Sequence, residues 1–327
     1  MLRYVAQRLL HTLIVLFGVS LLLFMLVHLI PGDPVLVILG TDATPGELER
    51  LRRLLGLDQP LHVQYLQYLG RLLRGEMGDS VFQHKPVVAL IGERLPATVE
   101  LTVAAMLIAI AIGLCVGIVA ALRPYSGFDV AAMLLALSGV AMPVFWLGML
   151  AILVFSLQLG WLPSFGRGEG IWEALRAWQR YGHPDDLVGS VKHLVLPSLT
   201  LGAFSTALIS RLVRSALLEV LGEDYVRTAR AKGMRERSVV IAHALPNALI
   251  PVVTVLGLQV GALLGGAVIA ETIFAWPGMG RLLIQSISQR DYPVLQGVVL
   301  VSAVAVSLIN LLVDLAYAVL NPRVRYE

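Results

Sequence analysis

One charged stretch of this sequence stands apart from its surroundings. Residues 227–251 read RTARAKGMRERSVVIAHALPNALIP and hold five Arg or Lys side chains against one Glu. The chain as a whole is 57% hydrophobic and only 14% charged. Guanidinium groups gathered in this way form ion pairs with carboxylates of a protein or with anionic lipid. The chemistry that this stretch indicates is docking, and the elements around it must hold it in place.

Two short helices are predicted in this region. Glu223 and Asp224 favour a helix N-terminus, because carboxylates interact well with the positive end of the helix dipole. Gly233 is suited to end that helix, since glycine adopts a left-handed backbone without strain. A second amphipathic helix, RERSVVIAHAL, follows, and Pro246 is expected to break it before the next apolar segment. The prediction is a helix–turn–helix lying along the membrane surface.

The elements that flank this region are apolar enough to cross a membrane. The mean hydropathy is +0.79, and several runs reach the eighteen or more apolar residues that a bilayer core requires. Arg3 and Arg8 precede a first run that is too long for a signal-peptide core and has no cleavage site, although a signal peptide is the alternative. We therefore expect an all-α polytopic membrane protein with six transmembrane helices, at 9–30, 97–122, 128–158, 194–216, 247–270 and 292–318.

The charges favour an orientation with both termini in the cytoplasm. That choice places 123–127 and 217–246 inside, and 31–95, 159–193 and 271–291 outside. The inside segments, the termini and the cytoplasmic end of the fourth span, with Arg211 and Arg214, together hold twelve basic residues against five acidic ones. Short basic loops stay on the cytoplasmic side, so the count supports the assignment.

The outer segment 31–95 is predicted to contain two helices. The tetrapeptide TPGE at 44–47 matches a capping box with proline at the first helical position, and the helix ends at Gly56. A second helix runs from Pro60 to Gly75 with an apolar stripe of leucines and tyrosines, which we expect at the membrane surface or against other spans. The segment is either a packed extracytoplasmic cap or a docking platform for a partner.

Catalytic signatures are missing from the sequence. The only lysines, at 85, 192 and 232, precede Pro, His and Gly, so no P-loop exists and the chain does not hydrolyse ATP by that route. HExxH, GxSxG and CxxC motifs are also absent, and Cys115 is the single cysteine. No catalytic or metal-binding residue is predicted, and the histidine and aspartates of 183–186 indicate a polar turn. An intramembrane hydrolase is an alternative, but it would need a nucleophile and a base at the same depth on facing spans, and the sequence offers no clear pair. A passive channel would need a ring of selectivity residues, and the sequence shows none.

A few polar residues within the apolar segments are candidates for other roles. Glu100 lies in the first turn after Pro96, where we expect a helix to begin. Asn310 and Asp314 share a face of the last span and are expected to hydrogen-bond to a neighbouring helix. The fifth span mixes small and polar residues, which suits a weakly polar pathway. The residues predicted to line it are Asn247, Thr254, Gln259 and Gly261.

The spacing of the cytoplasmic segment resembles the EAA motif of ABC-importer permease subunits. That pattern is Glu-Ala-Ala, three residues, Gly, nine residues, Ile, one residue and Leu-Pro. Residues 227–229 hold the triad here, followed by Gly233, His243 at the Ile position, and Leu245-Pro246. The stretch LGEDYVRTARAKG is similar to the dipeptide and oligopeptide variant, and GVSLLLFMLVHLIPGDP, ERLPATVELT, ETIFAWPGMGRLL and INLLVDLAYAVLNPRVR extend the likeness along the chain. It is greatest to the first of the two paired permeases of dipeptide importers.

The resemblance implies an ABC type I importer fold and a non-catalytic role. It divides the chain into 1–95, a span with an extracytoplasmic helical segment, and 96–320, a five-span permease core with coupling helices at 217–246. Expected partners are a second homologous permease, two ABC ATPase subunits, an extracytoplasmic substrate-binding protein and membrane lipid, but no nucleic acid. ATP and Mg would be bound by the ATPases, with no cofactor on this chain. The expected location is the bacterial or archaeal cytoplasmic membrane.

The resemblance also assigns roles to individual residues. Cargo would be dipeptides or short oligopeptides, with glutathione or nickel chelates as the alternative. Contact with the binding protein is expected at Glu271, Trp276, Pro277 and Gly278. A lipid anchor alone is the simpler alternative for the basic segment. Coupling to the ATPase is expected at Glu223, Asp224, Tyr225, Arg227, Thr228, Ala229, Arg230, Ala231, Lys232, Gly233, His243, Leu245 and Pro246.

Overall fold

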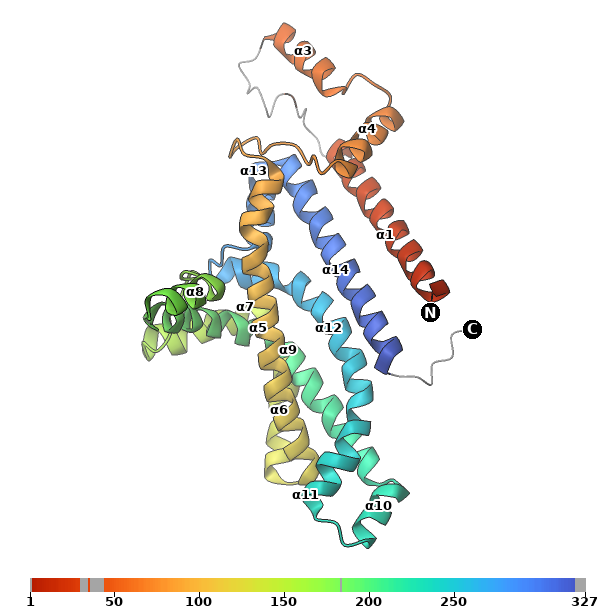
Figure 1. The fold of residues 1–327 in the computed structure, drawn as a ribbon. Coiled ribbons are helices and arrows are strands. Elements are labelled where there is room, and N and C mark those ends of the chain that lie inside the picture. The colour runs from red at the N-terminus through yellow and green to blue at the C-terminus, as the bar shows by residue number, and fades with distance from the viewer. Residues whose placement is uncertain (1, 30–34, 36–43, 183, 321–327) are drawn as a thin grey trace. The chain divides into compact units, whose positions relative to one another are not determined.

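The computed structural model describes residues 2–29, 35, 44–182 and 184–320. Within these ranges, the side chains of 2–6, 51, 54–55 and 314–320 are not described. The described chain consists of helices joined by turns (Figure 1). The chain forms two compact units. The first contains residues 1–96 and 281–308, and the second contains 97–280 and 309–325. Asp314 lies outside the described side chains, and Asn310 is exposed.

The first unit contains an N-terminal helix and a pair of amphipathic helices. These are α1 (Leu2–Leu29), α3 (Pro45–Leu55) and α4 (Leu61–Leu73). The unit also holds the first turns of α5 (Val87–Leu122), most of α13 (Met279–Gln289) and the first half of α14 (Tyr292–Leu320). The remaining elements belong to the second unit.

The second unit is built around α5, α9 and α12. Its elements are the rest of α5, α6 (Gly127–Ala141), α7 (Val144–Ala151) with a π-helical turn (Ile152–Gln158), α8 (Ile171–Tyr181), α9 (Asp185–Leu221), α10 (Asp224–Ala231), α11 (Glu236–Ser238) with a second π-helical turn (Val239–Ala244), and α12 (Leu245–Ile273). The helices α12 and α6 pack against α9. Among the described residues, five helices are long and apolar enough to span a membrane, or six if the bent pair α6 and α7 is one span.

Two of these helices are longer than their apolar cores suggest. Helix α5 begins at Val87 and continues through Pro96, so the expected helix start after that proline is wrong. Helix α9 extends from Asp185 to Leu221 and contains Pro197. An internal proline removes one hydrogen bond, but the bonds of the flanking turns keep the helix intact.

The third predicted span, 128–158, is two helices rather than one. Helices α6 and α7 meet at Met142-Pro143 with a bend of 111°. Proline lacks the amide that would continue α6, and the residue before a proline is driven towards extended backbone. Met142 indeed has φ −82° and ψ 133°. Apolar composition alone predicted a continuous rod, because hydropathy does not register this break.

Both predicted helices of the outer segment are confirmed. At the start of α3, the backbone N–H and the hydroxyl of Thr44 both donate to Glu47, at 2.9 and 2.7 Å. These bonds lower the pKa of Glu47 below its ordinary value. Gly56 ends the helix with φ 69°. The capping signals were local, which is why the sequence located this helix well.

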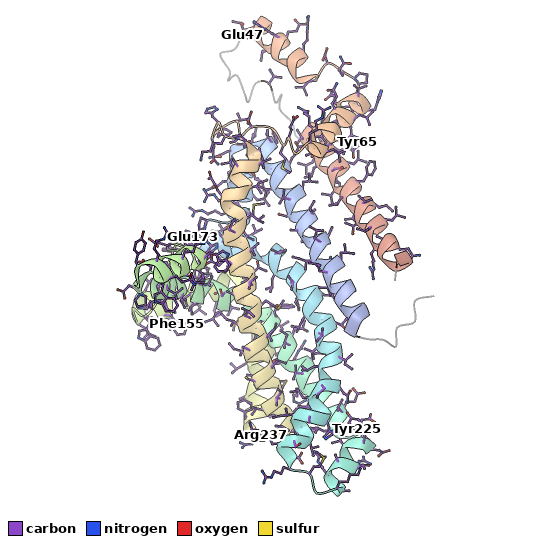
Figure 2. The ribbon with its side chains drawn as sticks, viewed as in Figure 1. Glu47, Tyr65, Phe155, Glu173, Tyr225 and Arg237 are labelled. Carbon is purple, nitrogen blue, oxygen red and sulfur yellow. The ribbon has the colours of Figure 1, made fainter. Side chains whose placement is uncertain are left out.

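Helix α4 packs against α1 through its tyrosines. Tyr65 lies 5.9 Å from Phe17 and 5.3 Å from Phe24 between ring centroids, and its hydroxyl is 2.9 Å from Ser20 Oγ. His28 contacts Gln64 of α4, with 3.1 Å between Nε2 and Oε1. The stripe predicted on this helix therefore covers a span, as Figure 2 shows near Tyr65.

Glycines allow α5 and α9 to approach closely. A Cβ added at Gly202 would lie 2.7 Å from the carbonyl oxygen of Ala105, and one at Gly117 would lie 2.7 Å from that of Ser210. Since both obstacles are backbone atoms, neither can move aside. Small residues therefore set the spacing of this pair, as they do in many membrane helix pairs.

Candidate functional site

The charged segment forms the short helix α10 at one end of the second unit. Glu223 is its N-cap residue, and the helix runs over Asp224–Ala231. Gly233 follows with φ 76°, a left-handed conformation that an L side chain rarely adopts. Both predicted ends of this helix are confirmed.

One face of α10 is anchored in the unit. Val226 has no exposed surface and Ala229 is 7% exposed. They pack in a cluster that includes Leu217 of α9 and Val239 and Ala244 of the following π-helical turn. Burying one valine side chain stabilises by roughly 1.5–3 kcal/mol, so this short helix is held by packing as well as by its caps. Ala229 therefore faces inwards, and its role is to fit α10 closely against the spans.

Polar contacts connect α10 to the beginning of α12. The hydroxyl of Tyr225 donates to the carbonyl of His243 at 3.3 Å and accepts from Asn247 Nδ2 at 2.8 Å. Arg230 donates to both carboxylate oxygens of Glu236, at 3.1 and 2.6 Å. This hydrogen-bonded carboxylate raises the pKa of Arg230 above its ordinary value. Packing and hydrogen bonds together join the short helix to a long one.

The expected break at Pro246 does not occur. Residues from Glu236 to Ile273 form one continuous helical segment, in which a π-helical turn precedes α12 and Pro246 stands in the first turn of α12. A π-helical turn shifts the hydrogen-bond pattern by one residue, which accommodates a proline without ending the helix. The segment that follows α10 is therefore continuous with a span. Leu245 is half-buried there, and Pro246 is exposed.

The opposite face of α10 is exposed and carries both signs of charge. Arg227 and Asp224 are 70% and 95% exposed as side chains and form a surface ion pair at 3.3 Å. Figure 2 shows Tyr225 and Arg237 at this end of the second unit. An exposed face of mixed charge on an anchored helix has the features of a protein-docking surface. Its other exposed members are Glu223, Tyr225, Thr228, Arg230, Ala231, Lys232 and Gly233, while His243 is half-buried beneath.

The predicted pathway residues have mixed environments along α12. Asn247 is exposed and joins the network of Tyr225, while Thr254 is half-buried and its hydroxyl donates to its own helix at Ile250. Gln259 is buried at 6% exposure, and Gly261 is half-buried. Their role in a pathway stays a prediction.

Burial corrects the expectation of a docking surface at 271–278. Glu271 and Trp276 have no exposed surface, Gly278 is buried, and Pro277 is half-buried. A side chain that is enclosed by its own chain offers nothing to a partner. The Trp-Pro-Gly signal did mark a turn, but the turn folds inwards and links α12 to α13.

These residues instead fasten the far end of α12 to α5. Trp276 Nε1 donates to the carbonyl of Ala97 at 2.8 Å. The Thr98 hydroxyl donates to Glu271 at 2.5 Å and accepts the Met279 amide at 2.8 Å. Buried carboxylates are tolerated when hydrogen bonds satisfy them. Helix α12 therefore contacts α10 at its beginning and is hydrogen-bonded to α5 at its other end.

Two ion pairs in the second unit were not predicted from the sequence. Glu100 pairs with Arg167 and accepts the Ile171 amide at 3.1 Å, so it caps α8 rather than its own helix. Arg214 of α9 donates to both oxygens of Asp129 of α6, at 2.6 and 2.7 Å. In each pair, a charged residue inside an apolar run indicated that an ion pair was needed. The sequence alone does not show which residue is the partner. No metal-binding group of three or more His, Cys, Asp or Glu residues occurs among the residues that the structure describes.

Family profiles match almost the whole chain. The profile described as "Binding-protein-dependent transport system inner membrane component" matches residues 113–326. A companion profile for the N-terminal part of such membrane components matches residues 1–102. The segment with α10, and the spans that hold it, lie within the first match.

Several curated proteins are similar over their full length. The di/tripeptide transport system permease protein DppB of Pseudomonas aeruginosa is 47% identical, and the dipeptide transport system permease protein DppB of Alkalihalophilus pseudofirmus is 46% identical. The glutathione transport system permease protein GsiC of Escherichia coli K12 is 45% identical. Each alignment covers 100% of both chains.

A solved structure shares the fold. The inward-facing MetNI methionine ABC transporter aligns with a TM-score of 0.54 and 20% identity, over 72% of this chain and 97% of that one. A second crystal form of the same transporter gives 0.55. At 20% identity, this match supports the fold and carries no information about function.

Proposed function

The chain belongs to the family of inner-membrane components of binding-protein-dependent transport systems, and we propose that it carries dipeptides or short oligopeptides across the cytoplasmic membrane. It acts as one permease subunit of an ATP-driven importer. The observation that carries this proposal is the construction of α10, which is anchored on one face, exposed on the other, and joined to α12. A helix built in this way is suited to transmit movement from a partner.

The proposed mechanism is alternating access driven from the cytoplasmic side. An ATPase subunit receives the exposed face of α10, and closure of the ATPases on ATP moves the helix together with α12. Energy enters through the difference in stability between inward- and outward-facing states, so this chain performs no covalent chemistry. The residues proposed to contact the ATPase are the exposed ones, with Asp224, Arg227 and Lys232 providing charge.

The proposed assembly contains four further protein chains, as the family implies. They are a second homologous permease, two ABC ATPases that hold ATP and Mg, and an extracytoplasmic binding protein. We place the complex in a bacterial cytoplasmic membrane, with both termini of this chain inside. The basic and acidic side chains on α10 offer the recognition that an ATPase cleft requires.

The substrate proposal rests on relatives. The two DppB relatives are named for dipeptide or di/tripeptide transport, and each spans the full chain. Glutathione is the second candidate, because GsiC is 45% identical over the same length. Glutathione is itself a tripeptide derivative, so one mildly polar pathway suits both classes. Nickel chelates are a more distant alternative.

A reconstituted importer tests the coupling role of α10. The full complex in liposomes is supplied with binding protein, dipeptide and ATP, and both uptake and ATP hydrolysis are measured. Arg227→Glu reverses a charge that is 70% exposed, so the fold should survive while uptake falls at least about tenfold. Arg180→Glu, on the exposed surface of α8, is the matched control and should transport normally.

Two results would contradict the proposal in different ways. Normal uptake by both Arg227→Glu and Gly233→Trp would remove α10 from the coupling path. Uptake of glutathione or of a nickel chelate without uptake of dipeptides would reject the substrate and leave the coupling role intact.

A further inference from the structure

A basic cavity lies between α3 and α4. Its volume is about 650 Å³, and three arginines border it. Arg53 comes from the last turn of α3, while Arg71 and Arg74 come from the end of α4. Gln59 and Gln67 add amide groups, and none of the described residues that line the cavity is acidic. The site is therefore positive and rich in hydrogen-bond donors.

Hydrogen bonds fix the corner that shapes this cavity. Gly56 turns the chain with φ 69°, and the buried Gln64 donates to the carbonyls of Leu57 and Gln59 at 3.2 and 2.7 Å. The same amide group contacts His28 of α1. Because the link between the two helices is tied to α4 and to the span, the arginines are presented on a defined scaffold.

Helix α4 lies beside the end of the span α1. Gln64 of α4 contacts His28, one residue before the last residue of α1, and Tyr65 reaches Ser20 further along the span. Leu66 and Leu73 are 65% and 89% exposed on the same helix. Leucines so exposed beside a span are suited to contact with lipid, as in amphipathic helices that lie in the interface.

The charges of the cavity are available for a ligand. Within the described part of the chain, Arg71 and Arg74 make no ion pair, and Arg53 makes one exposed pair with Glu49 at 3.1 Å. A guanidinium presents parallel N–H donors that match phosphate oxygens. Leu66 also lines the cavity, so an apolar wall stands beside the cations.

We propose that this cavity binds the phosphate group of an anionic phospholipid, with Arg53, Arg71 and Arg74 on the headgroup and Leu66 against the acyl chain. The ligand belongs to the membrane leaflet on which α3 and α4 lie. The site needs neither the ATPase nor the cargo, so it stands independently of the proposed transport function.

Lipid binding to the purified full chain tests the proposal. Native mass spectrometry of the chain in mild detergent would compare phosphatidylglycerol with phosphatidylcholine of the same acyl length. Each guanidinium near an anionic surface contributes a roughly fivefold preference, which corresponds to about 1 kcal/mol. Wild-type protein should prefer phosphatidylglycerol, and Arg71→Gln with Arg74→Gln should reduce this preference at least about fivefold.

Controls separate the site from general charge effects. Arg176→Gln with Arg180→Gln removes two exposed arginines from α8 and should leave the preference unchanged. Arg71→Lys with Arg74→Lys keeps the charge and should retain most of it, which covers the case in which the glutamine variant fails to fold. Equal binding of the two lipids would overturn the proposal. Displacement of phosphatidylglycerol by millimolar inorganic phosphate would show a free-phosphate site and overturn it as well.

Discussion

Replacing Thr98 by valine should loosen the outer attachment of α12. The substitution keeps the shape of the side chain and removes its hydroxyl, which is the group that connects Glu271 to the Met279 amide. Thr98 is 5% exposed and Glu271 has no exposed surface, so water does not replace the lost bonds. Two buried groups therefore lose a partner in one step.

The magnitude follows from these two bonds. A hydrogen bond to a charged group contributes about 1.5–3 kcal/mol, and a buried amide without an acceptor costs about 1–3 kcal/mol. Thr98→Val should lower the free energy of unfolding by about 3–5 kcal/mol. Thr98→Ser keeps the hydroxyl and loses one methyl group, for a cost of about 1 kcal/mol.

Denaturant titration of the purified chain in mild detergent, followed by tryptophan fluorescence, would give both values. The reasoning requires the valine variant to be the weaker of the two. Valine keeps the methyl group and lacks the hydroxyl, so a valine variant as stable as the wild type, with only the serine variant destabilised, would show that the hydroxyl does not hold this corner.

Three further predictions concern other contacts. Tyr225→Phe removes the hydrogen bonds between α10 and α12 at an exposed position, so unfolding should change by less than about 0.5 kcal/mol while peptide uptake per ATP, measured in liposomes, falls severalfold. Burial raises the pKa of Tyr68 to about 12. Because the pKa of Tyr68 is higher in the folded state than in the unfolded one, the neutral hydroxyl contributes stability below pH 10, and this contribution is lost as the pH rises towards 12. Circular dichroism should show the loss as a decline in helix content, and Tyr68→Phe should remove that decline. Gly117→Leu would press a Cβ against the Ser210 carbonyl and should cost about 1–3 kcal/mol or more in the same titration, whereas Gly18→Ala, which has nothing within 4 Å, should be neutral.

Local signals in the sequence were reliable because their causes are local. The cap of α3 depends on residues three apart, and the end of α10 depends on the backbone freedom of Gly233. The motif from residue 227 to Pro246 identified the family for the same reason, since it is read as spacing along the chain. Neither observation required knowledge of distant contacts.

Prolines were misjudged because their effect depends on the surrounding helix. Pro96 and Pro246 were expected to begin or break helices, yet both lie in continuous helical segments. Pro143 follows a bend of 111° that hydropathy concealed. The same residue type thus has different outcomes, according to whether neighbouring packing and π-helical turns can compensate for the missing amide.

By itself, the sequence determined the class of the molecule: an apolar, helical membrane chain with one charged segment and the spacing of an importer permease. Those features follow from composition and short-range pattern, which act wherever the chain lies. Only the tertiary structure decided that Trp276 and Glu271 face inwards, that Glu100 caps α8, and that Asp129 receives Arg214. Burial and ion pairing depend on which segments come together in space. The contacting residues are 67 to 179 positions apart in the sequence, so no local sequence pattern predicts their contact.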